Sequence, residues 1–150
     1  MATTFTKILI HFIFSTKNRD PLIAPEIEPL LHAYMIGIAR NYGCWTIAMN
    51  GIQDHVHMLV SLGKQITVSH LMEEVKGDSS RWMNKEHPPA QLFRWQEGYA
   101  ALSIGESGVE ALKAYIAHQK QHHQRKTFQE ELLEILKNYG VPYDERYMWT

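Results

Sequence analysis

Apolar positions recur along the chain at two spacings, which together predict a mixture of strands and helices. Residues 7–15 contain the most apolar stretch, Ile-Leu-Ile-His-Phe-Ile-Phe, and predict a buried first strand. Further on, apolar side chains recur three and four residues apart, as on one face of a helix: Leu30, Leu31, Tyr34, Ile38 and Tyr42. Pro25 suits the first turn of a helix and Gly43 its left-handed end, so we expect a helix over residues 25–42.

A β-hairpin is predicted over residues 44–61. Residues 45–49 (Trp-Thr-Ile-Ala-Met) are rich in strand-forming side chains, and Asn50-Gly51 is a strong signal for a two-residue hairpin turn. The returning strand carries His55 and His57, and Gly63 ends it.

A second helix is expected to begin at Thr67 and to meet Gly77. Residues 76–82 (Lys-Gly-Asp-Ser-Ser-Arg-Trp) allow two interpretations. Gly77 marks either a kink or the boundary between two helices, since glycine inside a helix costs about 1 kcal/mol relative to alanine. Alternatively, it lets a phosphate approach the backbone between Lys76 and Arg81. The sequence does not decide between them.

Short strands are expected at residues 93–95 and 99–104, joined around Glu97-Gly98. Ser107 and Glu110 have the spacing of a capping box, which predicts a third helix through about residue 123. The same device at Thr127 and Glu130 predicts a fourth helix, stopped by Gly140, with inward side chains Leu132, Leu133, Ile135 and Leu136. We expect the aromatic tail, residues 141–150, to dock on the domain.

This order of strands and helices favours an α+β fold, an antiparallel sheet layered with helices. Its 150 residues fit a single domain over residues 1–150, with no repeats and no internal boundary. The one cysteine, Cys44, excludes an internal disulfide and a cysteine-built zinc site, and we expect it to be buried. Residues 8–14 are too short to span a membrane, and no secretory signal precedes them, so we expect a cytoplasmic protein.

The net charge of −1 argues against a protein that coats DNA without regard to sequence. A nucleic-acid enzyme stays possible, because a local basic patch supplies the field that such an enzyme needs.

Candidate chemistry begins at residues 54–60 (Asp-His-Val-His-Met-Leu-Val). On a strand, His55 and His57 project from one face while Val56 and Met58 project from the other. Taken alone, such a pair is more often two ordinary strand histidines than a metal site.

The third predicted helix changes that balance. Tyr115 and Gln119 are four residues apart and share one face, which His122 extends. A divalent cation would take His55, His57 and the Gln119 carbonyl as ligands and leave positions open for a phosphate oxygen. Tyr115 would then be the nucleophile, although a phenol with a pKa of about 10 needs a cation or a base to ionise near neutrality.

With these residues in place, the sequence resembles the single-tyrosine HUH transposases, small transposases of bacterial insertion sequences that move as single-stranded DNA. The resemblance covers nearly the whole chain through five motifs in order: residues 14–19, 54–60, 76–81, 95–99 and 115–119. They are similar to the family's first-strand exit, histidine motif, second-helix signature, segment before the last strands and nucleophile helix. The implied fold is the ferredoxin-like, HUH-type α/β sandwich.

The resemblance implies cleavage of single-stranded DNA at element ends, through a 5′-phosphotyrosine and a free 3′-hydroxyl, and rejoining without ATP. It further implies Mg²⁺ or Mn²⁺ as the metal, and a DNA hairpin near the element end as the recognised feature. The family works as a homodimer whose composite sites combine histidines of one subunit with the tyrosine of the other. Basic side chains near the matched motifs are the candidate DNA contacts: Lys17, Arg19, Lys76 and Arg81.

A homodimer is also expected because the fourth helix and the tail offer apolar surface that the domain need not bury internally. The main alternative function is a domesticated or inactive transposase that keeps the fold as a DNA-binding dimer, and a purely structural dimer is a third possibility. Histidine-triad nucleotide hydrolases would want a third alternating histidine where Leu59 stands. Zinc hydrolases of the His-x-His-x-Asp-His type are excluded by Leu59 and Val60.

Overall fold

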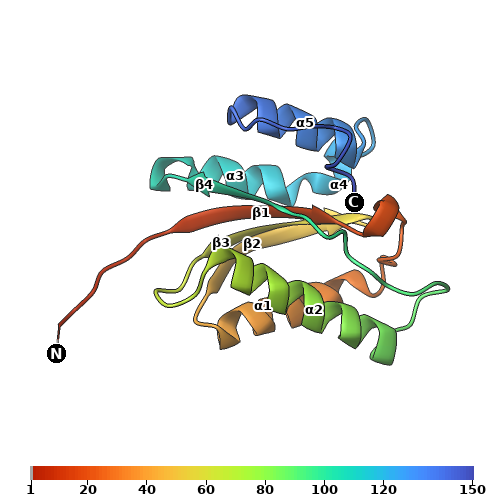
Figure 1. Cartoon of the computed structure of the whole chain (residues 1–150), viewed down its shortest axis with the longest axis horizontal. Helices are drawn as coiled ribbons and strands as arrows, with labels where there is room; N and C mark the ends of the chain where they lie inside the picture. Colours follow the sequence, from red (N-terminus) through yellow and green to blue (C-terminus); the bar gives the residue numbers. More distant parts are fainter. Residues whose placement is uncertain (1) are drawn as a thin grey trace.

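The computed structural model describes residues 2–150 as a four-stranded antiparallel sheet with helices on both faces (Figure 1). Its strands are β1 (Leu9–Ser15), β2 (Trp45–Ile52), β3 (His55–Ser61) and β4 (Ala100–Ile104). They lie in the order β2-β3-β1-β4, and every neighbouring pair is antiparallel. The predicted α+β class is confirmed.

The central strand β1 is buried on both sides, as the apolar stretch at its position predicts. Phe12 and Phe14 point into a core shared with two helices, whereas Leu9 and Ile13 point into the opposite face. This alternation follows from the two-residue period of a strand. Because both faces of β1 and β3 are covered, side chains on either face lie away from water.

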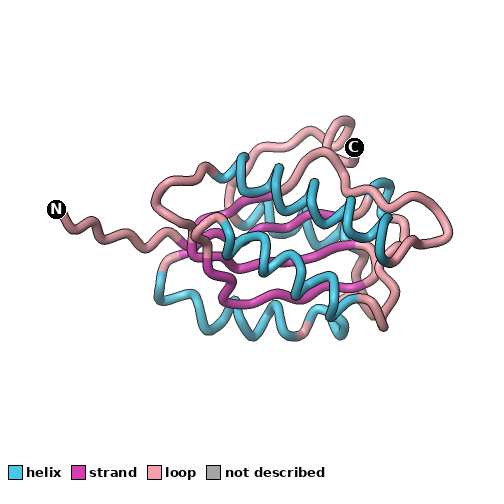
Figure 2. The backbone as a smooth tube through the Cα atoms, turned by 90° about the horizontal axis from the view of Figure 1, so that it is seen from below, coloured by secondary structure: helices cyan, strands magenta, loops and turns pink. Residues whose placement is uncertain are grey.

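One face of the sheet is covered by α1 (Glu28–Asn41) and α2 (Val68–Glu86), which lie side by side over the strands and run roughly along them (Figure 2). The first helix confirms the prediction but starts three residues later, because Pro25 lies in the preceding turn. Gly43 has a φ of +77°, the left-handed conformation expected after a helix end. Thr67 caps α2 by accepting a hydrogen bond from the backbone N–H of His70.

The second helix does not end at Gly77. It continues to Glu86, so the interpretation of Gly77 as a boundary between two helices is wrong. Val75, Ser79 and Met83 are buried on one side of this long helix, which indicates that tertiary packing offsets the cost of one glycine.

The opposite face carries α3 (Val109–Ala117), the single-turn α4 (Gln119–His122) and α5 (Phe128–Asn138). Val109 and Ile116 of α3 pack against Leu59 of β3. Next to it, α5 packs on β1 and β4, where Ile13 and Leu102 meet Phe128, Leu132 and Leu136 (Figure 1). Two short 3-10 helices, Lys17–Arg19 and Glu106–Gly108, complete the elements of the described residues.

The fourth predicted helix has the ends that the sequence indicates. The Thr127 side chain accepts a hydrogen bond from the Glu130 N–H at 3.1 Å, and Gly140 follows the helix with a φ of +67°.

The hairpin turn lies at Gln53-Asp54, so the predicted turn at Asn50-Gly51 is wrong. Asn50 and Gly51 belong to β2 and pair with His57 and Val56. Gly51 is required for a different reason, because a Cβ there would lie 2.2 Å from the His55 carbonyl oxygen. The longer hairpin places His55 directly after the turn.

Two further local predictions fail. Residues 93–95 form no strand; only Trp95 makes an isolated bridge, to Thr16, and β4 pairs with β1 instead. Ser107 caps no helix, because it lies inside the short 3-10 helix and α3 begins after Gly108.

The tail docks on the domain, as expected. Met148 and Trp149 pack beside α5, and the Trp149 carbonyl accepts a hydrogen bond from Arg19 Nη1 at 2.7 Å. The apolar face of α5 is buried within the same chain, whereas Tyr143 and Tyr147 of the tail are exposed, so only the tail part of the expected apolar patch is present. Within residues 2–150, no helix is both long and apolar enough to cross a membrane.

His32 on α1 makes the fold sensitive to acid. It is 9% exposed, and its Nε2 has no hydrogen-bond partner among the described residues. Burial lowers its pKa from 6.5 to about 4; nearby Glu28 opposes this shift and Lys120 adds to it. As the pH falls below 6.5, the unfolded chain takes up a proton at His32 that the folded chain refuses until about pH 4. The free energy of unfolding therefore falls by up to about 3 kcal/mol as the pH drops from 6.5 to about 4.

We predict that His32→Leu flattens this part of the pH dependence. The variant should keep or exceed the parent's free energy of unfolding near neutral pH and should lose less of it at about pH 4.5. Chemical denaturation at both pH values measures this, with His70→Leu at an exposed position as control. Identical pH slopes for the parent and His32→Leu would contradict the assignment.

Candidate active site

The two strand histidines face the same side of the sheet. His55 and His57 are fully buried, and their ring centroids are 5.2 Å apart. Val56 and Met58 point into the core on the other face, so the predicted alternation is confirmed.

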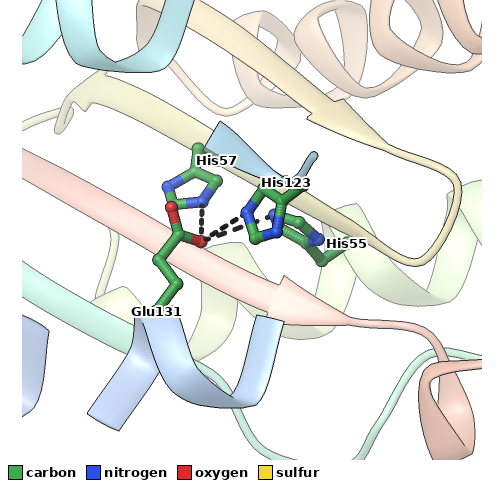
Figure 3. A group of neighbouring side chains, drawn as sticks. All are labelled: His55, His57, His123 and Glu131. Carbon is green, nitrogen blue, oxygen red and sulfur yellow. Dashed lines mark hydrogen bonds and ion pairs between the residues drawn. The ribbon is translucent and has the colours of Figure 1, made fainter. Parts of the chain in front are cut away.

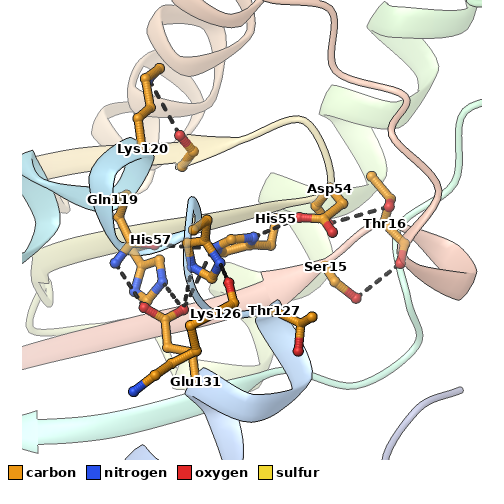
Figure 4. A network of polar contacts seen from close by, with 12 residues as sticks. Ser15, Thr16, Asp54, His55, His57, Gln119, Lys120, Lys126, Thr127 and Glu131 are labelled. Atoms are coloured by element: carbon orange, nitrogen blue, oxygen red, sulfur yellow. Dashed lines mark hydrogen bonds and ion pairs between the residues drawn. The ribbon is translucent and has the colours of Figure 1, made fainter.

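Each of these imidazoles is oriented by a second group. Asp54 Oδ1 accepts a hydrogen bond from His55 Nδ1 at 2.7 Å (Figure 4). His57 Nδ1 lies 2.8 Å from Nε2 of the buried His11 on β1. Burial lowers the pKa of His11 to about 3, so His11 is neutral at physiological pH. Both ring planes are thus held, and both Nε2 atoms point toward α4 and α5.

Tyr115 and Gln119 do not share one helix, as the predicted helix through residue 123 would require. The chain leaves helical geometry at His118, which separates α3 from α4. The break is stabilised by Asn50, whose Nδ2 donates to the carbonyls of Ile116 at 3.0 Å and Ala117 at 3.2 Å. Since Asn50 pairs with His57 across the hairpin, this contact sets the helix joint relative to the histidine strand.

The two side chains nevertheless meet at one carboxylate, that of Glu131 on α5. The Tyr115 hydroxyl donates to Glu131 Oε2, and Gln119 Nε2 donates to the same oxygen at 2.9 Å. The other oxygen, Oε1, lies 3.0 Å from His57 Nε2 and 3.6 Å from His55 Nε2 (Figure 3). The predicted residues are therefore gathered in one chain, around a residue that the sequence prediction does not contain.

His123 is the second unpredicted member of the cluster. Its Nε2 lies 3.0 Å from Glu131 Oε1, and its Nδ1 donates to the Lys126 carbonyl at 2.6 Å. The sequence holds two signals for these residues: the crowding of histidines at 118–123, and an acidic residue directly before Leu132 on the apolar face of α5.

The site's electrostatics centre on Glu131, which is 2% exposed. Burial, the largest influence, raises its pKa. Hydrogen bonds from His123, His57 and Tyr115 outweigh that effect and hold the pKa well below its ordinary value. The pKa of Tyr115 is raised, first by burial and then by the neighbouring carboxylate. The ring of His122 stacks on the Tyr115 ring at 4.6 Å.

The donor set fits a metal ion. The ligand atoms of His55, His57, His123 and Glu131 all lie within 4.8 Å of one another. The Gln119 carbonyl oxygen lies 3.1 Å from His55 Nε2, so it faces the same point. Neutral imidazoles, a carboxylate and an amide oxygen are the donors that divalent metals take in proteins.

Two of the four predicted DNA contacts share a cavity on the α2 side of the sheet. The cavity, of about 530 Å³, is lined by Lys17, Lys76, Arg94, Trp95 and Tyr99 among others. Lys76 donates to the backbone carbonyls of Glu97 and Gly98, and burial lowers its pKa to about 8.

Arg19 and Arg81 lie elsewhere. Arg19 is held against the tail by its bond to the Trp149 carbonyl, and Arg81 is an exposed partner of Asp78. Gly77 lines the cavity, which leaves the phosphate-approach interpretation as a prediction.

Known proteins share both this sequence pattern and this fold. The sequence model of the family described as "Transposase IS200 like" matches residues 4–119. The ISDra2 transposase TnpA of Deinococcus radiodurans is 27% identical over 114 residues, which cover 73% of this chain and 81% of that protein.

Two solved structures resemble the fold. A protein from Deinococcus radiodurans described as a transposase has a TM-score of 0.64 and 24% identity, over 79% of this chain and 95% of the other. A REP-associated tyrosine transposase, bound to a REP hairpin, has a TM-score of 0.62 and 16% identity, over 82% of this chain and 73% of the other. The family match spans the histidine strand, α2, β4 and Tyr115 through Gln119, so the chain belongs to the IS200-like transposases, the single-tyrosine HUH family.

Proposed function

We propose that this transposase cleaves and rejoins single-stranded DNA through a covalent bond between Tyr115 and a 5′-phosphate. The observation that supports this most strongly is the shared carboxylate of Glu131. One of its oxygens accepts a hydrogen bond from the Tyr115 hydroxyl, while the other faces the imidazoles of His55 and His57. Metal-assisted phosphoryl transfer through a covalent intermediate needs a nucleophile close to a metal site, and Glu131 brings the two together here.

The proposed reaction conserves one phosphodiester bond. The Tyr115 oxygen attacks the scissile phosphorus, the bond to the 3′-oxygen breaks, and that oxygen takes a proton to become a free 3′-hydroxyl. The Tyr115 hydroxyl donates to Glu131 Oε2, so this carboxylate is the group within reach that would take the proton as a bound cation lowers the pKa of the phenol, and that would pass it on to the 3′-oxygen. Rejoining reverses these steps when another 3′-hydroxyl attacks the phosphotyrosine, and because a phosphodiester is exchanged at each step, ATP is not needed.

His55, His57 and Gln119 would hold the divalent cation, Mg²⁺ or Mn²⁺. When bound, the ion supplies Lewis-acid polarisation of the scissile phosphate. Asp54 and His11 keep the two imidazoles oriented for this task, and the Gln119 amide is anchored by Glu131 with its carbonyl toward His55.

We propose the cavity with Lys17 and Lys76 as a contact region for a DNA hairpin near the cleavage site. It combines cationic side chains with aromatic surface at Trp95 and Tyr99, as single-stranded nucleic-acid sites do. A member of the same fold class is bound to a REP hairpin, which agrees with this class of partner. Arg19 and Arg81 remain candidate contacts outside the cavity.

The arrangement within one chain supports catalysis in cis. The Tyr115 and His57 rings of the same chain are 6.0 Å apart, and Asn50 secures the joint after Tyr115. A homodimer with sites shared between subunits, as the family resemblance implies, makes the opposite prediction about which chain supplies the tyrosine.

Tyr115→Phe should abolish the covalent DNA adduct while leaving folding and DNA binding unchanged, because only the attacking oxygen is lost. A single-stranded oligonucleotide carrying the element end, incubated with Mg²⁺ or Mn²⁺ and run on a denaturing gel, measures the adduct. Tyr139→Phe, at an exposed tyrosine, is the matched control. An adduct that persists in Tyr115→Phe identifies another nucleophile, and a parent chain that binds this DNA without cleaving it supports an inactive DNA-binding derivative.

Lys17→Ala should weaken hairpin binding and reduce the slope of log K against log salt by about one, as expected for one lost phosphate contact. Fluorescence anisotropy at several salt concentrations measures both quantities. Lys137→Ala, which removes an exposed lysine on α5, is the control. Equal slopes for the two variants would remove Lys17 from the DNA contact region.

Mixing His57→Ala with Tyr115→Phe protein under subunit exchange separates the cis and shared arrangements. In cis, each active site keeps one defect, so we expect the mixture to stay inactive. In a shared dimer, one site collects both defects and the other none, so the return of adduct formation would overturn the cis assignment. Light scattering on the same samples reports whether a dimer forms at all.

A further inference from the structure

We propose that His123 and Glu131 are additional metal ligands, so that this site selects a first-row transition ion such as Mn²⁺ or Co²⁺ over Mg²⁺. This inference deepens the proposed function and rests on its metal centre at His55 and His57. Both added residues lie beyond residue 119, where the family match ends. The site would then be completed by α5 and by the segment that leads into it.

The tautomers of two histidines are set by their neighbours. His55 Nδ1 faces the carboxylate of Asp54 at 2.7 Å, and His123 Nδ1 faces the backbone carbonyl of Lys126 at 2.6 Å. A carbonyl and a carboxylate accept hydrogen bonds and donate none, so both Nδ1 atoms must carry the hydrogen. A metal ligand must be a neutral imidazole, and in that form each Nε2 presents a lone pair toward the site, whereas without a metal a proton on His123 Nε2 would be held by Glu131.

Those lone pairs point at oxygen atoms that are also acceptors. His123 Nε2 lies 3.0 Å from Glu131 Oε1, and His55 Nε2 lies 3.1 Å from the Gln119 carbonyl oxygen. Exchanging the two ends of the Gln119 amide would not help, since its nitrogen already donates to Glu131 Oε2 at 2.9 Å. Two acceptors that face each other in a buried site repel unless a proton or a metal ion lies between them, and one metal ion would serve all of these contacts at once.

The third imidazole fits the same scheme. His57 has its Nδ1 2.8 Å from neutral His11 and its Nε2 3.0 Å from Glu131 Oε1. Each of the three rings thus has one nitrogen engaged outside the site and the other directed into it, toward Glu131. Figure 3 shows the three rings gathered around this carboxylate. Outer hydrogen bonds of this kind orient histidines that bind metals.

The separations between donor atoms match a coordination sphere. Ligands about 2.1 Å from a metal lie about 3.0 Å apart at a right angle and about 3.4 Å apart at a tetrahedral angle. Glu131 Oε1 is 3.0 Å from Nε2 of both His57 and His123, and 3.6 Å from Nε2 of His55. All four ligand atoms lie within 4.8 Å of one another, so the imidazoles would move toward a common ion when they bind it.

The buried charge also calls for a cation. Glu131 is 2% exposed, and its ion-pair partners within residues 2–150 are all histidines. The nearby lysines are engaged elsewhere, Lys126 with Glu134 and Lys120 with Glu28. Tyr115 and Gln119 donate to Oε2 of this carboxylate, and Oε1 faces only imidazole nitrogens, so a divalent ion at Oε1 would compensate the charge in place of a proton on those rings.

The donor types determine the class of metal. Mg²⁺ prefers oxygen ligands and keeps several waters, while three imidazoles with one carboxylate favour Mn²⁺, Co²⁺ or Zn²⁺. Oε2 of Glu131 accepts a hydrogen bond from the Tyr115 hydroxyl. With the ion bound at Oε1, the same carboxylate would therefore link the ion to the nucleophile. Metal binding would accordingly fix α5 against the histidine strand.

The test is metal binding in the absence of DNA, which separates this proposal from the cleavage assay. Metal-free full chain is titrated with Mn²⁺ while electron paramagnetic resonance reports free Mn²⁺, and Mg²⁺ is added as a competitor. We expect one Mn²⁺ per chain and poor competition by Mg²⁺. His123→Asn and Glu131→Gln should each weaken Mn²⁺ binding about tenfold or more. The controls His70→Asn and Glu134→Gln, at exposed positions, should bind as the parent does.

Spin-echo modulation of bound Mn²⁺ counts the coordinated imidazoles directly. We expect three in the parent and two in His123→Asn; two in the parent would overturn the proposal even if a variant fails to fold. Unchanged affinity in both variants, competition by Mg²⁺ at equal concentration, or tighter Mn²⁺ binding by Glu131→Gln would also overturn it. In each of these cases, a DNA adduct that depends on Tyr115 would leave the proposed function intact.

Discussion

The buried carboxylate of Glu131 is the contact on which the arrangement of this face of the molecule depends. A charge in a dry interior must be met by donors or cations, and here the donors come from three separate parts of the chain. Tyr115 lies in the last turn of α3, Gln119 is the first residue of α4, and His57 lies on β3. Their convergence on one group explains how residues as far apart along the chain as His57 and Glu131, 74 positions, form one site.

The sheet makes such a site possible because its central strands are covered on both faces. On the α1/α2 side, Phe12, Phe14 and Met58 form a continuous apolar core that holds β1 and β3 in place. On the other side, α3 and α5 pack separately, through Leu59 and Ile116 in one cluster and Ile13 and Phe128 in the other. The polar site is enclosed near the junction of these two clusters, where His55 contacts Phe128. Water is thereby kept from the imidazoles, which strengthens every electrostatic interaction among them.

The match to the IS200-like transposases includes only part of the residues that surround the site. The family match ends at Gln119 and so includes the histidine strand and the tyrosine helix. The segment that follows brings His123 and Glu131 into the same cluster, and its apolar side is buried in the domain rather than left for a partner. The centre of this transposase is therefore more enclosed, and richer in nitrogen donors, than its motifs alone indicate.

Local signals in the sequence determined much of the architecture. The α+β class, the buried strand β1, the shared face of His55 and His57, the Gly43 helix end and the Thr127 cap all follow from periodicity and short-range chemistry. Tertiary contacts decided the rest. The hairpin turn lies at Gln53-Asp54 and not at Asn50-Gly51, because Asn50 and Gly51 pair within β2. There the missing side chain of Gly51 lets the His55 backbone approach closely. The third predicted helix is interrupted at His118, where Asn50 donates hydrogen bonds to the carbonyls of residues 116 and 117, about 66 positions away. Glu131 and His123 lie in the site because α5 packs on the sheet. The pattern of residues within a helix does not predict which distant strand its buried acidic side chain will face.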